Sequence, residues 1–331
     1  MNAMNLQAGS SGGTVLVLTE PGDTTADLVA GELDHRGAKV FRMDTAEFPQ
    51  SLQVSAQFDG GWRGEISGAD GSVDLRDIRS VYVRRPTEFV FPASMTDAEQ
   101  RFAAREARRG IGGLLMSLPC SWVNHPSKVA DAEYKPFQLA VAAACGLTVP
   151  RTVVTNVPAD AGEHRDFLGA SVVYKTLASA VVSDGPRPSI IYTTDVSSAE
   201  MADSRVGLTA HQFQARIPKV RDVRATVVGK QVFAATIVAT DEAVGELLDW
   251  RSDYAALRYE PVSLPPSVEA SLLAMTEHLG LFFAAADFVV TADDRHYFVD
   301  LNPNGLWGWI AEATGLPIAA AIAAQLTGAD Q

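Results

Sequence analysis

A β-hairpin pattern near the C-terminus limits the possible folds more than any other part of the sequence. Two apolar runs flank Asp293-Asp294 in FFAAADFVVTADDRHYFVDLN, residues 282–302. If those two aspartates form the centre of a tight turn, the register places Asp287 directly opposite Asp300. Their Cβ atoms would then lie roughly 4.5–5.5 Å apart. We therefore expect an antiparallel ribbon that carries two facing carboxylates.

The opposite face of this hairpin should be apolar. The same register pairs Phe288 with Val299 and Val290 with Tyr297, which gives a stripe suited to a core. Asn302 is the next residue after Asp300 on the carboxylate face. A stretch built only for packing would not carry these polar residues, so we expect the carboxylate face to bind a ligand.

Facing carboxylates on a half-buried sheet repel each other. One of them would stay protonated unless a cation sits between them. Oxygen atoms of Asp287, Asp300 and Asn302 suit Mg²⁺, which usually completes its coordination with substrate phosphates. The alternative interpretation is an acidic sheet surface that faces solvent, since pairs of acids on exposed strands are common.

Length and composition limit the class of protein. The 331 residues predict two or three packed units rather than one small core. With 47% hydrophobic and 20% charged residues, the balance is that of a globular protein. The net charge of -13 argues against a general binder of nucleic acid or anionic membrane. An anionic ligand would therefore need a local cationic cluster.

The sequence also predicts a location in the cell. Cys120 and Cys145 have no metal-ligand spacing and are expected to be reduced thiols. The first residues lack the basic and apolar regions of a secretion signal. No run reaches the roughly 18 apolar residues of a membrane span. We expect a cytoplasmic protein with no nucleic-acid or membrane partner, and residues 1–13 are set aside as a disordered or vector-derived tail.

The N-terminal part alternates strand and helix patterns. A strand, a helix and a second strand over 14–20, 23–35 and 38–44 predict a β-α-β unit. Its first turn reads TEPGDT and lacks G-x-G-x-x-G, so support for dinucleotide binding is weak. We expect this part to continue with a hairpin, another strand and an Arg-rich helix, at 51–58 with 62–67, at 78–86 and at 96–116.

Two further units follow. The second contains a helix ending at Gly146, a short strand and the strand SVVYKTL (171–177). The small, polar segment 178–189 should form a mobile loop whose backbone N–H groups could fold over phosphates. The third unit contains a hairpin that turns at Gly229-Lys230, followed by the hairpin described above.

Four cationic residues strengthen the case for an anionic ligand. Lys175 lies inside an apolar strand and Lys135 near the start of a helix. A lysine in a buried strand needs an anionic partner, and phosphate is a natural one. Arg224 and Arg251 would add guanidinium forks for oxyanions. Each residue alone could be structural, but with the hairpin they describe a nucleotide-triphosphate site.

These motifs resemble the ATP-grasp superfamily and, within it, the graspetide synthetases, the microviridin-type ligases that crosslink ribosomal peptides. DLNPNG with an upstream Asp is typical of ATP-grasp proteins in general. DWR with NPNGLWGWI and TGLPI is more specific to the peptide-crosslinking branch. The similarity covers most of the chain after residue 120, and VYVRRP (81–86) belongs to an opening domain similar to that of the family. The segments that carry it are KPFQLAVAAACGLTVPRT (135–152), VVYKTL (172–177), FQARIPKVRDVRATVVGKQVFAATI (213–237), DWR (249–251), LGLFFAAADFVV (279–290) and YFVDLNPNGLWGWIAEATGLPI (297–318).

The resemblance implies an architecture. It predicts an α/β (α+β) ATP-grasp fold in three units, with an N-terminal pre-ATP-grasp β-α-β domain. The expected limits are 14–120 for that domain, 121–207 for the central ATP-grasp subdomain and 208–331 for the C-terminal ATP-grasp subdomain.

The resemblance also implies roles around a bound ATP. Lys135 and Lys175 would hold the nucleotide phosphates, while Arg224 and Arg251 would stabilise the transferring phosphoryl group. Two Mg²⁺ ions are expected, with Asp287, Asp300 and Asn302 as their protein ligands.

A hinge at 213–217 would contact adenine through Gln214, Ala215 and Ile217, and Lys219 would reach the ribose. The hinge reads FQAR where relatives often carry Gln-Glu. Ala215 has no carboxylate to offer, so contacts from this position would be backbone hydrogen bonds.

The implied activity is an ATP-dependent macrocyclase. It would phosphorylate Asp or Glu side chains in the core of a precursor peptide and close macrolactones with Ser or Thr hydroxyls. The alternative is a carboxylate-amine ligase that forms macrolactams or adds free amino acids to a carboxylate. A non-catalytic module with a vestigial nucleotide site is disfavoured by the intact Lys, Arg and Asp/Asn set.

The implied partner is a precursor peptide with a leader and an acidic, Ser/Thr-containing core. The leader would bind away from the active site, near 180–260. Arg84 and Arg85 are candidates for contacting the acidic core, although both could instead cap a strand and form local salt bridges. The resemblance suggests a homodimer. The sequence does not determine whether the rings are closed by esters or by amides, nor how many rings form and which residues they join.

Overall fold

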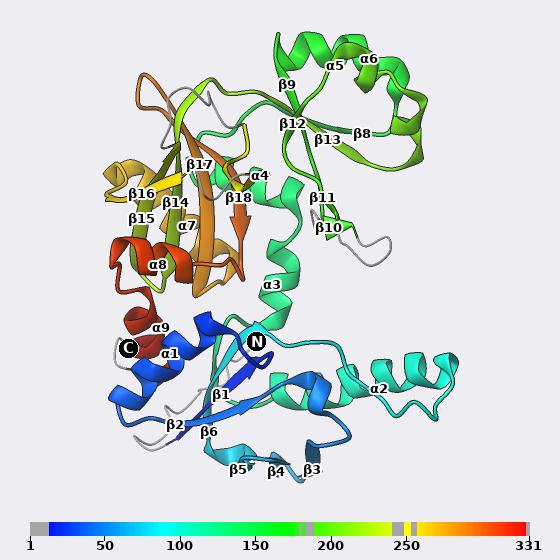
Figure 1. Ribbon diagram of the computed structural model, residues 1–331, viewed down its shortest axis with the longest axis vertical. Helices are drawn as coiled ribbons and strands as arrows, with labels where there is room; N and C mark the ends of the chain where they lie inside the picture. The colour runs from blue at the N-terminus through cyan, green and yellow to red at the C-terminus, as the bar shows by residue number, and fades with distance from the viewer. Residues whose placement is uncertain (1–12, 179–180, 183–188, 240–247, 253–256, 329–331) are drawn as a thin grey trace.

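The computed structural model describes residues 13–178, 181–182, 189–239, 248–252 and 257–328. Figure 1 shows a parallel sheet in the lower part, a small sheet at the upper right and a large antiparallel sheet at the upper left. The chain folds into a mixed α/β structure with separate parallel and antiparallel sheets. Within the described part of the chain, we found no helix with the length and apolar character of a membrane span.

The N-terminal sheet is parallel and buried on both faces. Its order is β2-β1-β6-β7, and its strands are β1 (Thr14–Thr19), β2 (Lys39–Met43), β6 (Ile78–Arg85) and β7 (Ser121–Val123). Every residue of β1 is buried, which explains why its sequence is apolar without alternation. Helix α1 (Thr24–His35) begins where the Asp23 side chain accepts hydrogen bonds from the backbone N–H groups of Thr25 and Ala26. The predicted β-α-β unit is confirmed.

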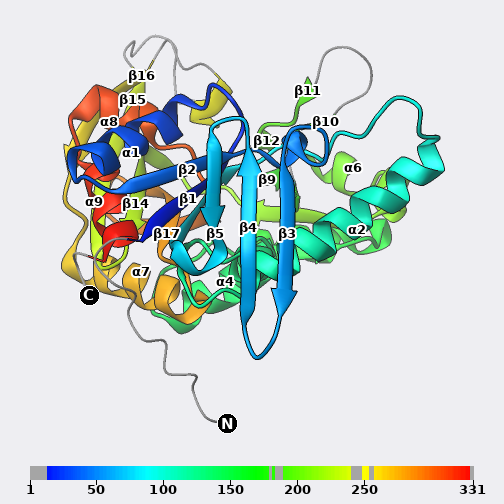
Figure 2. The same cartoon turned by 90° about the horizontal axis from the view of Figure 1, so that it is seen from below.

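A three-stranded antiparallel sheet and a long helix complete this part. The strands are β3 (Gln53–Phe58), β4 (Trp62–Gly68) and β5 (Gly71–Asp74). The sequence predicted β3 and β4 but not β5, which has only four residues. Helix α2 (Asp97–Met116) starts with a capping box between Thr96 and Glu99. Figure 2 shows α2 extending to one side of the molecule, beyond this sheet.

The central sheet is small and carries Lys175 at the end of a strand. Its order is β12-β9-β13-β8, and its strands are β8 (Thr152–Thr155), β9 (Val172–Lys175), β12 (Thr194–Asp195) and β13 (His211–Ala215). Helices α5 (Ala161–Leu168) and α6 (Ser198–Met201) pack with it, and β10 (Val181–Val182) pairs with β11 (Ser189–Ile190). The loop predicted at 178–189 lies mostly outside the described residues.

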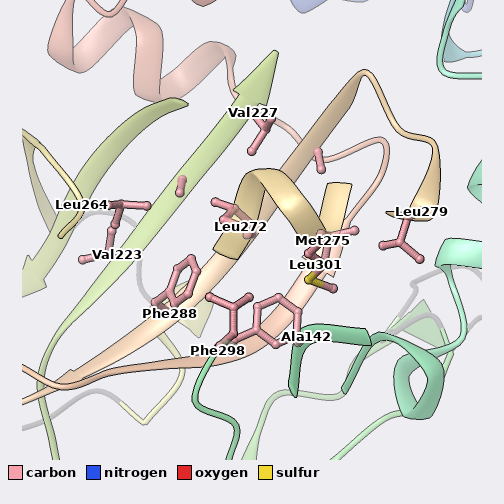
Figure 3. Packing of buried hydrophobic residues seen from close by; sticks show 14 of the residues in the cluster. Ala142, Val223, Val227, Leu264, Leu272, Met275, Leu279, Phe288, Phe298 and Leu301 are labelled. Carbon is pink, nitrogen blue, oxygen red and sulfur yellow. The ribbon is translucent and has the colours of Figure 1, made fainter. Parts of the chain in front are cut away.

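The C-terminal sheet is antiparallel and carries the predicted carboxylates. Its order is β16-β15-β14-β17-β18, and its strands are β14 (Lys219–Val228), β15 (Gln231–Ala239), β16 (Leu257–Val262), β17 (Phe283–Thr291) and β18 (His296–Asn302). One face packs against α4 (Lys135–Ala144) and α7 (Pro266–Leu279), with α3 (Pro126–Ala132) beside them. Figure 3 shows Phe288 and Phe298 meeting Leu272 and Met275 in this core. Phe288 and Val290 of the predicted apolar face are therefore buried, whereas Val299 and Tyr297 are only half-buried and line cavities.

The last two helices join the C-terminal sheet to the N-terminal domain. They are α8 (Gly308–Thr314) and α9 (Ile318–Thr327). A shared core combines Val15 and Val29 of the N-terminal domain with Trp307, Ile318 and Ile322. This packing holds the turn after β18 against the N-terminal domain.

The hairpin register was predicted correctly at one pair and wrongly at two. Asp287 does oppose Asp300, but Phe288 opposes Phe298 and Val290 opposes His296. The reason is a longer turn, in which Thr291 and Arg295 are paired by backbone and hydroxyl hydrogen bonds around Asp294, whose φ is 60°.

A register shift between Asp287 and Phe288 then restores the pairing of the carboxylates. It leaves Val299 as an extra residue in β18, a β-bulge. Val299 and Asp300 consequently line the same cavity, although they are neighbours in sequence.

Candidate active site

A cavity lies between the central sheet and the C-terminal sheet. Its walls come from β9, β13, the hinge that follows β13, the start of β14, β17, β18 and residues 248–251. Eight of the predicted site residues line it, namely Lys175, Gln214, Ala215, Ile217, Lys219, Arg251, Asp287 and Asp300. Segments far apart in the sequence therefore build one site.

The two facing carboxylates have different cationic neighbours. Asp300 accepts a 2.7 Å hydrogen bond from the Nζ atom of Lys135, at the start of α4. Arg224 pairs with Asp287 across β14 and β17, and its Nε atom is 3.7 Å from Asp287 Oδ1. Both carboxylates are largely buried, with side-chain exposures of 17% for Asp300 and 13% for Asp287.

Burial and charge shift the pKa values of this pair in opposite directions. Burial raises the pKa of Asp287, and the nearby Arg224 and Arg251 only partly oppose it. Burial also acts to raise the pKa of Asp300, but Lys135 and Lys175 outweigh it, so that the pKa of Asp300 is lowered. Asp300 is thus the firmly ionised member of the pair.

The residues fit a bound divalent cation. Asp287 Oδ1 is buried and has no hydrogen-bond partner among the described residues, which is costly for a carboxylate oxygen. Nowhere in the described ranges do three His, Cys, Asp or Glu side chains gather as a complete metal site. Mg²⁺ is commonly bound by one or two protein carboxylates, and substrate phosphates supply further ligands.

Asn302 lies at the edge of this arrangement. It is exposed, it pairs with Ala285 and its Oδ1 atom accepts a 3.2 Å hydrogen bond from the backbone N–H of Asn304. It is not among the residues that line the cavity.

Lys175 is half-buried next to the carboxylates. Its Nζ atom donates a 2.9 Å hydrogen bond to the carbonyl oxygen of Val299, the bulged residue of β18. Burial lowers the pKa of Lys175 to about 8, against the opposing attraction of Asp300. An anion in the cavity would compensate this charge and raise the pKa.

Arg251 is held by an aspartate that our sequence reasoning did not assign. Asp249 Oδ1 and Oδ2 accept 2.8 Å hydrogen bonds from Nε and Nη2 of Arg251, and the backbone N–H of Thr193 donates to Oδ2 at 3.0 Å. Burial would raise the pKa of Asp249, but these hydrogen bonds lower it to about 2. The DWR motif therefore fixes the guanidinium group of Arg251 at the cavity. The two-residue spacing of Asp249 and Arg251 was the sequence feature that could have predicted this pair.

Two more residues escaped the sequence reasoning. Asp222 Oδ2 accepts a 2.6 Å hydrogen bond from Lys219, and burial raises the pKa of Asp222 to about 6. Gly305 lies against the catalytic candidate Arg224, since a Cβ atom there would be 3.0 Å from Arg224 Nη2 and 2.5 Å from Ala285 Cβ. In the sequence, Lys219 and the NPNG motif were the only signs of these two residues. The hydrogen bond between Lys219 and Asp222 and the contact of Gly305 with Arg224 follow only from the fold.

The hinge uses part of its hydrogen-bonding capacity within the protein. The backbone N–H groups of Ala215 and Arg216 donate to the carbonyl oxygens of Arg151 and Ser171, both at 2.9 Å. The Gln214 side chain donates to Thr152. Hydrogen bonds to a base would therefore have to come from other hinge groups than these two N–H groups.

Arg84 and Arg85 lie outside the cavity and differ in exposure. Arg84 is only 4% exposed, and its Nη1 atom donates to the carbonyl oxygen of Asn304 at 3.1 Å. Its Nε atom is 3.5 Å from Asp23 Oδ2. Arg85 is exposed at the end of β6. Of the two, Arg85 is the one open to a peptide.

Comparisons with known proteins agree with this geometry. Residues 14–130 match the family model described as the MvdD pre-ATP grasp domain. The crystal structure of macrocyclase MdnC from Microcystis aeruginosa MRC, bound with precursor peptide MdnA, covers 95% of this chain and 99% of its own, with 28% identity and a TM-score of 0.83. This chain is an ATP-grasp ligase.

Two other solved structures are similar to this ATP-grasp ligase over almost its whole length. A Chryseobacterium gregarium RiPP-associated ATP-grasp ligase, in complex with ADP and a leader and core peptide, covers 96% of this chain and 98% of its own, with 26% identity and a TM-score of 0.86. Macrocyclase MdnB from Microcystis aeruginosa MRC covers 95% and 99%, with 29% identity and a TM-score of 0.78. A sequence comparison with curated proteins gave no match.

Proposed function

We propose that this ATP-grasp ligase matures a ribosomally made precursor peptide by closing side-chain macrolactones. It would activate Asp or Glu side chains of an acidic core, with Ser or Thr hydroxyls as acceptors. The single observation that carries the proposal is the pair of facing carboxylates, Asp287 and Asp300, which line a cavity together with Lys175 and Arg251 and have Lys135 and Arg224 as ion-pair neighbours. MdnC, solved with a precursor peptide, is similar over almost the whole chain.

The chemistry explains why the site needs so much positive charge. A carboxylate is a poor electrophile, because its charge is delocalised and oxide is a poor leaving group. Transfer of the γ-phosphoryl group of ATP to a carboxylate oxygen gives an acyl phosphate and ADP. A hydroxyl oxygen then attacks the acyl carbon, phosphate leaves with the C–O bond electrons, and the hydroxyl proton is released.

The residues of this chain would contribute charge and alignment rather than a nucleophile. Lys135 and Lys175 would bind the phosphates, and Arg224 and Arg251 would stabilise the phosphoryl group during its transfer. The Asp249 carboxylate would keep the Arg251 fork oriented, since it accepts two of its hydrogen bonds.

Magnesium belongs to the same proposal. Asp287 and Asp300 would hold it, with Asn302 as a further oxygen donor, and we propose two ions. When bound, Mg²⁺ would neutralise charge on the phosphate oxygens. On the nucleoside side, the hinge at Gln214, Ala215 and Ile217 would border the base, and Lys219 would reach the ribose.

The test is a reconstitution with mass spectrometry. The purified chain is incubated with ATP, Mg²⁺ and an acidic Ser/Thr-containing precursor peptide. We expect the loss of one water and the release of one ADP for each ring. Mild alkaline treatment should then reopen the rings, because an ester is cleaved under conditions that leave an amide intact.

Other outcomes would point elsewhere. Rings that resist alkali would indicate macrolactams with Lys acceptors. A gain in mass in the presence of free amino acids would indicate the carboxylate-amine ligase instead. Dehydration that is equally fast in an Asp300→Asn variant would remove the carboxylate pair from the reaction.

A further inference from the structure

A second and larger cavity lies on the other side of the hinge. It has a volume of about 550 Å³, within the range of ligand-binding pockets. Its walls are residues 148–151, which lead into β8, residues 168–171, which lead into β9, the hinge 215–217, and Arg295 and Tyr297 from the β17–β18 hairpin. We call it the hinge groove.

The hinge groove is positively charged in an acidic protein. The chain has 40 acidic and 27 basic residues, yet the groove is lined by three arginines and by no aspartate or glutamate. One of them, Arg216, donates a 2.9 Å hydrogen bond to Asp195. The other two are Arg151 and Arg295. The hinge groove is therefore locally positive, although the whole chain has a net charge of -13.

Arg151 and Arg295 are oriented by aromatic rings. The guanidinium carbon of Arg151 is 5.9 Å from the ring centre of Phe167, and that of Arg295 is 5.5 Å from the ring centre of Tyr297. Within the described residues, neither guanidinium group donates a hydrogen bond or forms an ion pair, although Arg295 attracts Asp293 of its own turn at longer range. Stacking restrains an arginine while leaving its N–H groups open to an anion.

We propose that the hinge groove binds a carboxylate-rich segment of the peptide substrate. The assignment rests on the proposed function and adds a second contact region to it. Arginine forks match carboxylates in geometry, and the apolar groups of Val149, Leu168 and Ala170 between them suit a peptide chain. The three arginines come from three separate segments of the groove wall. A dispersed set of carboxylates is therefore favoured over a concentrated polyphosphate.

The hinge groove is physically joined to the nucleotide cavity. Pro150, Ala215, Arg216 and Ile217 line both. A segment that contacts Arg151 and Arg295 together would bridge the central and C-terminal sheets, whose relative position also shapes the nucleotide cavity. Occupation of one cavity should consequently change affinity in the other, by the same factor in both directions.

The experiment measures binding rather than turnover. The full chain is titrated into fluorescein-labelled hexaglutamate at low salt, followed by fluorescence anisotropy, with and without ADP and Mg²⁺. The groove variant is Arg151→Glu/Arg295→Glu, and both residues are exposed. The charge-matched control is Arg101→Glu/Arg108→Glu, which alters exposed residues of α2.

We expect at least about tenfold weaker hexaglutamate binding in the groove variant and unchanged binding in the control. ADP affinity measured by calorimetry without peptide should be the same in both variants and the wild type, and hexaglutamate should shift it only where the groove is intact. Equal hexaglutamate affinity in the groove variant and the wild type would overturn the assignment. Displacement of hexaglutamate by tripolyphosphate at lower concentration than by free hexaglutamate would also overturn it, in favour of a phosphate ligand.

A failure of the proposed function has a different signature. The wild type would then bind hexaglutamate in the groove but leave every precursor peptide at its original mass. The binding assay and the mass assay therefore report on the two proposals separately.

Discussion

Asp287 and Asp300 face each other across β17 and β18, but only Asp300 has a hydrogen-bonded cation. Lys135 holds Asp300 at 2.7 Å, whereas Arg224 approaches Asp287 no closer than 3.7 Å. The protein alone therefore satisfies one carboxylate and leaves the other in need of a ligand. This asymmetry predicts that the two residues respond differently to the same substitution.

Both Asp287→Asn and Asp300→Asn should abolish most activity, with kcat reduced about 10²- to 10³-fold, as expected when one electrostatic contact to the transition state is lost. Only Asp300→Asn should also destabilise the protein, by about 1–3 kcal/mol, because it leaves the largely buried Lys135 without its partner. Chemical denaturation and steady-state kinetics measure the two effects.

A matched control lies in the same hairpin. Asp294→Asn changes an exposed residue with a positive φ, a conformation that Asn also tolerates. It should leave kcat and stability close to the wild type. Equal loss of stability in Asp287→Asn and Asp300→Asn would contradict the asymmetry.

Nucleotide affinity should weaken at alkaline pH through Lys175. Its pKa in the free protein is about 8, so its ammonium group is present below that pH and is lost above it. ADP binding measured by calorimetry should therefore weaken as pH rises through about 8. A Lys175→Met variant should bind weakly at every pH and show no such change. A flat profile in the wild type would mean that Lys175 does not contact the nucleotide.

The same shift has a consequence for folding. Between pH 8 and 10.5 the unfolded chain holds a proton on Lys175 that the folded chain has released. The contribution of this residue to stability should therefore rise with pH in that window.

Asp249→Asn should lower kcat more than it raises the KM for ATP. The change removes charge from the carboxylate that holds Arg251 through two 2.8 Å hydrogen bonds, so the guanidinium loses its fixed orientation. We expect kcat to fall about 10- to 100-fold.

An aspartate that binds the arginine two residues later also occurs at Asp203 and Arg205, and this pair serves as the control. Asp203 accepts from Nε and Nη2 of Arg205 at 2.9 and 2.7 Å, on an exposed segment that does not line the cavity. Asp203→Asn should leave kcat unchanged. A comparable loss in both variants would show that the effect is not specific to the site.

Gly305→Ala should damage the site by overpacking. The new Cβ would be 2.5 Å from Ala285 Cβ and 3.0 Å from Arg224 Nη2, so that the turn or the arginine must move. We expect a loss of about 1–3 kcal/mol in stability, together with a lower kcat. Gly112→Ala in α2 meets nothing within 4 Å and should stabilise the protein by about 0.5–1 kcal/mol. Wild-type kcat in Gly305→Ala would show that Arg224 tolerates displacement.

The sequence predicted what depends on periodicity and on local signals. The β-α-β unit followed from a buried strand and a capped helix, and the facing of Asp287 and Asp300 followed from hairpin pairing. The pairing at Phe288 was wrong because turn length and a bulge at Val299 are set by packing and backbone geometry rather than by alternation.

The candidate site was likewise predicted only in part from the sequence. Residues with an unusual chemical context, such as Lys175 in an apolar strand, could be picked out and do line the cavity. Asp249 and Asp222 look ordinary in the sequence, and they gain importance only from the arginine and lysine that the fold brings to them. The hinge groove could not be foreseen, because its arginines come from segments far apart in the chain.

The two neighbouring arginines of β6 should separate peptide binding from stability. Arg85 is exposed, so Arg85→Glu should leave the unfolding midpoint unchanged and raise the KM for an acidic precursor peptide several-fold, with kcat little altered. Arg84 is buried between Asp23 and the Asn304 carbonyl, and Arg84→Glu would bury two facing acids. It should destabilise the protein by about 3–5 kcal/mol, as expected when a buried ion pair is broken. Unchanged peptide KM in a fully folded Arg85→Glu variant would remove β6 from the peptide-binding surface.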